Sequence, residues 1–155
     1  MNDLATAIEA AWAPWRAAVD RVGVDQFDDG TPAGWTVKEL LGHMAFWEEA
    51  TVGVVALLLR QTELPEGWRF GSGYQPEAEW PAAEVHNARE AAWATGVTAD
   101  EVLARLDAAH AESLDVVSGF TAAEVADERF RSYVDEKIGH YVEHLPELEA
   151  VAGPA

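Results

Sequence analysis

Apolar residues recur every three or four positions along most of the chain, which is the pattern of helices that bury one face. The first such segment is predicted to start with Asp3 as its cap and to end near Val22. Pro14 lies inside it, so a kink or break is expected near Ala13. Its apolar stripe is Leu4, Ile8, Trp12, Trp15, Val19 and Val22. Residues 22–34 are rich in Gly, Asp and Pro, which predicts a loop.

Capping boxes mark three later helix starts. In this motif a Thr side chain and a Glu three residues later each bind the other's free backbone N–H group. The box at Thr36 predicts a second helix to about Gln61. The box at Thr98 predicts a fourth helix with an apolar face to Val117, and the box at Thr121 opens a short turn at most.

Two further helices complete the pattern. One covers residues 82–95, and the last runs from Phe130 or Ser132 to Ala150, with a bend expected at Pro146. No segment alternates with the two-residue period of a strand. The sequence therefore predicts an all-α bundle of four long helices with a crossover between the second and third.

The connection at residues 62–81 is long and contains three Pro and three Gly. Loops of this length in a compact domain usually have a function or cross the whole molecule. This one also carries aromatic residues, for which cover of the core is favoured over the alternative of a roof that excludes water from the site: Trp68, Phe70, Tyr74 and Trp80.

The chain of 155 residues is expected to form one domain over residues 1–155. Its 28 acids against 10 bases give a net charge of −18, which argues against a nucleic-acid partner because such binding needs Lys and Arg to neutralise phosphates. There is no Cys, which excludes disulfides, thiolate nucleophiles and iron–sulfur clusters. A metal would have to bind His and carboxylate side chains.

No membrane partner is expected, because the longest apolar stretch, residues 50–59, is too short to span a bilayer. The N-terminus carries acids and lacks the basic segment of a secretory signal, so the cytoplasm is the expected compartment.

Two histidines predict the chemistry. His140 and His144 are spaced i, i+4, so both imidazoles project from one face of the last helix, and two such rings can bind one divalent ion. His43 lies in the middle of an apolar helix, where an inward imidazole needs a hydrogen bond or a metal. Two interpretations stay open for His43: a hydrogen-bonded boundary residue, or the third ligand of a catalytic metal with open coordination positions.

The segment from Trp35 to Glu48, with His43 and Trp47 inside it, resembles the first signature of DinB-like proteins. The pair His140 and His144 resembles the second half of that family's metal motif. Asn87 resembles the Asn that the DfsB and mycothiol-dependent maleylpyruvate isomerase branches carry early in the third helix. The similarity extends over essentially the whole chain.

The resemblance implies a four-helix bundle with up-down-down-up topology. It implies a divalent metal, often zinc or nickel and sometimes iron, held by positions His43, His140 and His144. Characterised relatives include transferases and isomerases that use a low-molecular-weight thiol such as mycothiol or bacillithiol. Members often form dimers, so a homodimer is a further expectation.

Residues near these ligands are candidates for a substrate site. Asn87 is the candidate catalytic residue, as a hydrogen-bond partner of substrate or of metal-bound water, with a plain surface Asn as the equal alternative. His86, Arg89 and Trp47 are candidates for binding a small electrophile. Outside this set, Glu48 and Glu143 could orient imidazoles, with solvated carboxylates as the favoured alternative. Tyr141 is expected in the core, and His110 is expected to be a boundary His with a hydrogen-bond partner.

Two functions stay open. The first is a metal-dependent S-transferase or hydrolase in which the ion activates an external thiol or water against a small electrophile. The second is a non-catalytic, stress-associated protein that binds metal and sequesters a ligand. A role in nucleic-acid damage is discounted because of the net charge.

Overall fold

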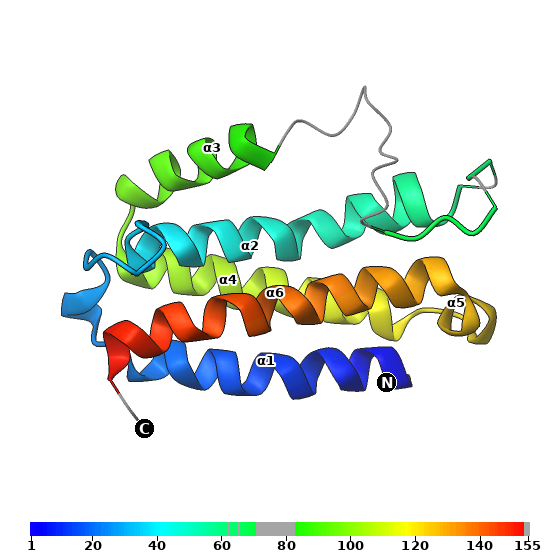
Figure 1. The fold of residues 1–155 in the computed structure, drawn as a ribbon, viewed down its shortest axis with the longest axis horizontal. Helices are drawn as coiled ribbons and strands as arrows, with labels where there is room; N and C mark the ends of the chain where they lie inside the picture. Colours follow the sequence, from blue (N-terminus) through cyan, green and yellow to red (C-terminus); the bar gives the residue numbers. More distant parts are fainter. Residues whose placement is uncertain (62, 65, 71–82, 154–155) are drawn as a thin grey trace.

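The computed structural model describes residues 1–61, 63–64, 66–70 and 83–153. Four long helices make up the bundle: α1 (Asp3–Arg21), α2 (Val37–Val54), α4 (Ala99–Ser118) and α6 (Glu128–Ala152). In Figure 1, α1 and α6 run in one direction and α2 and α4 in the other, which is the expected up-down-down-up order. α1 packs on α6, and α2 packs on α4.

The shorter α3 (Ala83–Thr95) belongs to the crossover between the second and third long helices. It packs against α2, on the outside of the four-helix core (Figure 1). The remaining short elements are η1 (Val24–Gln26), the π-helical turn η2 (Val55–Leu59) and α5 (Ala122–Ala126). The described residues contain one isolated β-bridge and no strand, so the all-α prediction is confirmed.

The capping boxes at Thr36, Thr98 and Thr121 are all confirmed, since each Thr hydroxyl accepts from the backbone N–H three residues later and each Thr backbone N–H donates to the Glu carboxylate there. The cap predicted for the first helix was wrong. Asn2 caps α1, because its Oδ1 accepts from the N–H of Ala5 at 3.0 Å. Its Nδ2 also donates to the carbonyl of Val117 at 2.7 Å, which joins the start of α1 to the end of α4.

One predicted helix break and two predicted helix boundaries differ from the structure. α1 is not broken at Pro14, because buried Trp12 and Trp15 anchor the turns on both sides of it. The second helix is α-helical only to Val54 and continues as the turn η2 to Leu59 instead of reaching Gln61. The last helix begins earlier than predicted, at Glu128, because Asp127 caps it.

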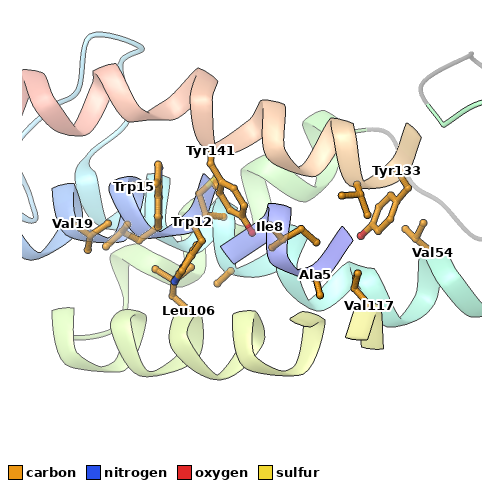
Figure 2. Packing of buried hydrophobic residues seen from close by; sticks show 14 of the residues in the cluster. Ala5, Ile8, Trp12, Trp15, Val19, Val54, Leu106, Val117, Tyr133 and Tyr141 are labelled. Atoms are coloured by element: carbon orange, nitrogen blue, oxygen red, sulfur yellow. The ribbon is translucent and has the colours of Figure 1, made fainter. Parts of the chain in front are cut away.

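The core fills the space between the four long helices (Figure 2). Trp15 and Ile8 of α1 meet Leu106 of α4 and Tyr141 of α6 there, and all four side chains are buried. No helix among the described residues is long and apolar enough to cross a bilayer.

The described part of the long connection packs onto this core. Trp68 is buried, and Phe70 lies edge-on against Tyr133 with ring centroids 5.0 Å apart. These two aromatics therefore act as the core cover that the sequence predicted. Tyr74 and Trp80 lie outside the described residues.

Gly42 permits the close approach of α3 to α2, which gives a first prediction. A Cβ at Gly42 would lie 3.2 Å from the Cβ of Ala94 and 3.4 Å from the carbonyl oxygen of Glu90, whereas a Cβ at Gly139 would meet nothing within 4 Å. Gly139→Ala is expected to stabilise the protein by about 0.5–1 kcal/mol, the usual gain from Ala over Gly inside a helix. In Gly42→Ala the new methyl group would crowd α3, which should offset this stabilisation. The urea midpoint of unfolding should therefore be lower for Gly42→Ala than for Gly139→Ala. Equal midpoints for the two variants would contradict the close packing.

Candidate metal centre

The fold brings together the three histidines that the sequence singled out. His43 comes from α2, and His140 and His144 come from successive turns of α6. The three ring centroids are 4.7 to 5.3 Å apart. Each ring offers one nitrogen to a set whose members all lie within 4.8 Å of one another. In the part of the chain that the structure describes, this is the one group of three or more side chains that could hold a metal ion.

The spacing of this group suits a first-row divalent ion. Zinc binds imidazole nitrogen at about 2.0–2.1 Å, so two nitrogens on one ion lie within about 4.2 Å of each other. The three nitrogens lie within 4.8 Å of one another, so the group must contract slightly for all three to reach one ion. Three His ligands also leave coordination positions for water or a substrate, as in catalytic zinc sites.

Hydrogen bonding determines which nitrogen of His43 is available. Nδ1 of His43 lies 2.9 Å from Oδ1 of Asn87 on α3, and donation to this amide oxygen keeps the proton on Nδ1. Nε2 of His43 therefore carries a lone pair, and it faces Nε2 of His140 at 2.9 Å. Two nitrogens this close need a proton or a cation between them. The donor set therefore fits a metal, and Asn87 orients His43.

Burial keeps two of the imidazoles neutral, which is the form that binds metal. Burial lowers the pKa of His43 to about 4, with the nearby His144 acting in the same direction and the Asn87 hydrogen bond opposing. Burial likewise lowers the pKa of His140 to about 3, assisted by His43 and His144.

Glu147, which the sequence analysis missed, orients the third histidine. Nδ1 of His144 donates to Oε1 of Glu147 at 2.7 Å, and Oε2 of Glu147 accepts from the hydroxyl of Thr31 at 2.9 Å. The spacing of His144 and Glu147, i, i+3 on one helix, could have indicated the pair. Glu143, the residue suggested by the sequence for orienting an imidazole, is exposed.

Two indoles flank the histidine group. Trp47 lies beside two candidate ligands, with its ring centroid 6.3 Å from His43 and 6.4 Å from His140. Trp35 was not predicted as a site residue, and its ring meets His43 edge-on at 4.6 Å and lies 6.3 Å from His144. The histidines are therefore bordered by aromatic surface on both sides.

His86 and Arg89 lie next to this border, on α3. His86 is buried and stacks on Phe46 with centroids 4.3 Å apart, and its ring lies 6.1 Å from that of Trp47. The guanidinium of Arg89 lies 5.1 Å from the centroid of the same Phe46 ring and donates to Glu90 at 2.9 Å. Trp47 therefore connects His86 to the histidine group directly, and Arg89 through Phe46.

Glu48 does not orient any of the three imidazoles, and it is not solvated either. Its side chain is 2% exposed, its Oε2 accepts from Nζ of Lys137 at 2.7 Å, and its Oε1 accepts from the hydroxyl of Tyr141. Nδ1 of His110 lies 3.5 Å from Oε2 of Glu48. These residues form a buried polar cluster at the centre of the bundle.

His110 has the hydrogen-bond partner that the sequence analysis expected. Its Nε2 lies 3.0 Å from Oε1 of Glu9, and its ring stacks on Trp12 at 3.8 Å. Tyr141, expected in the core, is buried there and makes the bond to Glu48.

The Glu48 cluster gives a prediction for acid stability. Burial alone would raise the pKa of Glu48, but the charge of Lys137 and the hydrogen bonds to the carboxylate outweigh it and hold the pKa at about 2, against 4.5 for the free side chain. As the pH falls below 4.5, the unfolded chain takes up this proton first, so the stability that the charged carboxylate provides is lost between pH 4.5 and 2. The loss amounts to about 3 kcal/mol.

Urea unfolding of the metal-free protein between pH 3 and 6 measures this effect. The contributions of the histidines are common to the wild type and Glu48→Gln, so they cancel in the comparison. The variant should show a shallower loss of stability on acidification. Parallel pH curves for the two proteins would contradict the assignment.

Comparison with known proteins agrees with this geometry. No curated protein and no solved structure matches the chain. A family model of the DinB superfamily matches residues 7–147, a span that includes His43, His140 and His144. The chain therefore belongs to the DinB superfamily.

Proposed function

We propose that this protein is a metal-dependent enzyme that joins a low-molecular-weight thiol, or water, to a small electrophile. His43, His140 and His144 would hold the ion, with zinc or nickel as the first candidates and iron as the third. The observation that supports the proposal best is the convergence of three imidazoles, two of which have their Nδ1 protons engaged by Asn87 and Glu147. Such outer partners are characteristic of metal-binding histidines.

The chemistry follows from the donor set. A bound divalent ion lowers the pKa of a coordinated thiol or water and so supplies a nucleophile near neutral pH. The chain has no Cys, so a thiol would have to come from outside, and mycothiol and bacillithiol are the candidates. Three protein ligands leave room for such a group beside the electrophile.

The surrounding residues would bind and orient the electrophile. Trp47 offers an apolar face beside His43 and His140, and His86 extends this aromatic surface across Phe46. Arg89 is exposed beside Phe46 and would offer an anionic group a positive charge that it shares with Glu90. Asn87 would orient His43 through its amide oxygen. Its NH₂ group then remains available as a donor to the substrate.

The proposal predicts metal-dependent thiol consumption. Purified protein loaded with zinc or nickel should consume mycothiol or bacillithiol in the presence of chlorodinitrobenzene, a generic electrophile. Chelated protein should lose this activity and regain it when the metal is restored. His43→Ala should be inactive under both conditions, whereas Glu143→Gln, an exposed change beside His144, should match the wild type.

Full turnover by the chelated protein would exclude metal-dependent catalysis. Stoichiometric metal binding without turnover of any thiol or electrophile would favour the second function considered for this sequence, a non-catalytic protein that sequesters a ligand.

A further inference from the structure

The loop between α1 and α2 reaches the histidine group through a chain of side chains. Thr31, in this loop, is buried, and its hydroxyl donates to Oε2 of Glu147 at 2.9 Å. The other oxygen of the same carboxylate accepts from Nδ1 of His144 at 2.7 Å. The side chains of His144 and Glu147 are only 12% and 13% exposed, so water competes weakly for these bonds. One carboxylate therefore joins the loop to a candidate ligand.

Backbone bonds hold this loop in a defined conformation. The N–H of Thr31 donates to the carbonyl of Trp35 at 2.6 Å, and the N–H of Gly34 donates back to the carbonyl of Thr31 at 2.9 Å. Gly34 has φ +91°, a conformation that favours glycine. The N–H of Val37 donates to the carbonyl of Asp29 at 3.0 Å, which fixes the loop to the start of α2.

The same turn places a second contact on the histidine group. The backbone N–H of Thr31 binds the carbonyl of Trp35 and so fixes the backbone of Trp35. The indole of Trp35 has its ring centroid 4.6 Å from that of His43 and 6.3 Å from that of His144. The loop thus meets one ligand through a hydrogen-bonded carboxylate and two ligands through an aromatic ring. An ion that fixes the orientation of His144 would also fix Glu147 and, through it, Thr31.

We infer that Glu147 and Thr31 are positioning residues of the metal centre, and that metal binding and the order of residues 27–36 are coupled through them. The inference deepens the proposed function and rests on it only for the presence of an ion. Glu147 keeps the proton of His144 on Nδ1, turns Nε2 toward the ion and makes the imidazole a stronger donor. Thr31 acts one step further out, because it holds the second oxygen of that carboxylate in place.

Zinc affinity in four variants tests the inference. Glu147→Ala should weaken zinc binding 10- to 100-fold, the usual effect of removing the partner of a metal-binding histidine. Thr31→Val, which removes only the hydroxyl, should weaken it by about threefold, the lower end of what one hydrogen bond contributes. Glu143→Gln removes the same type of charge from an exposed neighbour of His144 and should change the affinity by less than about twofold. Competition with a chromophoric chelator measures all three.

The double variant separates positioning from independent effects on stability. If Thr31 acts through Glu147, then Thr31→Val should cost nothing further in the Glu147→Ala background. Hydrogen exchange gives a second readout: zinc should protect the amides of residues 27–36 in the wild type and Glu143→Gln, and not in Glu147→Ala. The ¹⁵N shifts of His144 should report a protonated Nδ1 in the zinc-loaded wild type.

Two results would overturn the inference: equal zinc affinity in Glu147→Ala and Glu143→Gln, or full additivity of the two substitutions. Both can be obtained on a protein that binds zinc normally, so they leave the proposed function intact. Conversely, zinc binding that depends on Glu147 in a protein without thiol turnover would contradict the proposed activity and support the inference.

Discussion

Lys137→Met is expected to lower the free energy of unfolding by about 3–5 kcal/mol, the cost of breaking a buried ion pair by removing one partner. Lys137 and Glu48 have side chains that are 6% and 2% exposed, and their charged atoms are 2.7 Å apart. Burial lowers the pKa of Lys137, and the charge of Glu48 opposes this shift. Without the lysine, the carboxylate of Glu48 would keep Tyr141 as a neutral donor but lose its bonded cation. Urea unfolding at pH 7 measures the loss.

The chain supplies a matched control, because Lys38 is its other lysine. Lys38 pairs at 3.1 Å with Asp28, whose side chain is 82% exposed. Lys38→Met should therefore cost at most about 1 kcal/mol, as for other ion pairs at the surface. Adding Glu48→Gln to Lys137→Met should restore part of the lost stability, because the amide keeps an acceptor for Tyr141 without a buried charge. A similar cost for the two lysine variants would refute the assignment.

Replacing any one of the three clustered histidines by Ala should reduce zinc affinity by about 100-fold or more. Structural zinc sites gain about 10–16 kcal/mol from four ligands, so one ligand contributes about 3 kcal/mol. His140→Ala is the most informative of the three, because His140 lies in the middle of the set and its Nε2 faces His43 at 2.9 Å. Elemental analysis and chelator competition report the loss.

Circular dichroism of the same variant distinguishes lost ligation from lost folding, since the metal-free variant should remain helical. Val142→Ala, an exposed change two residues further along α6, serves as the control and should bind zinc like the wild type. If His140→Ala retains wild-type affinity, three-histidine coordination is wrong.

Local physical chemistry made much of the fold predictable. The capping boxes at Thr36, Thr98 and Thr121 depend on side chains three residues apart; the first two start long helices as expected, and the third starts the five-residue α5 where a short turn at most was expected. The start of α6 depends on a local cap that the prediction missed, Asp127, whereas the cap of α1 also makes a contact with a distant segment. Asn2 caps α1 while it bonds to Val117 of α4, and nothing near Asn2 in the sequence indicates that partner.

In the candidate site too, features set by local spacing were predictable and features set by distant contacts were not. The i, i+4 spacing of His140 and His144 is visible in the sequence, and the resemblance to DinB-like proteins identified His43 as their partner. Glu147 has a helical spacing that could have indicated it, but 28 acidic residues offer many such pairs. The bond between Lys137 and Glu48 joins residues 89 positions apart, so no local pattern could have predicted it.

The position of α3 outside the four-helix core has an evolutionary consequence. This helix packs mainly on α2, yet it supplies Asn87 to His43 and carries His86 beside Trp47. Substitutions on its inner face can therefore change the surroundings of the three histidines while the helices that carry them keep their packing. Under the proposed function, specificity could then change through this one peripheral helix without any change in the three histidines.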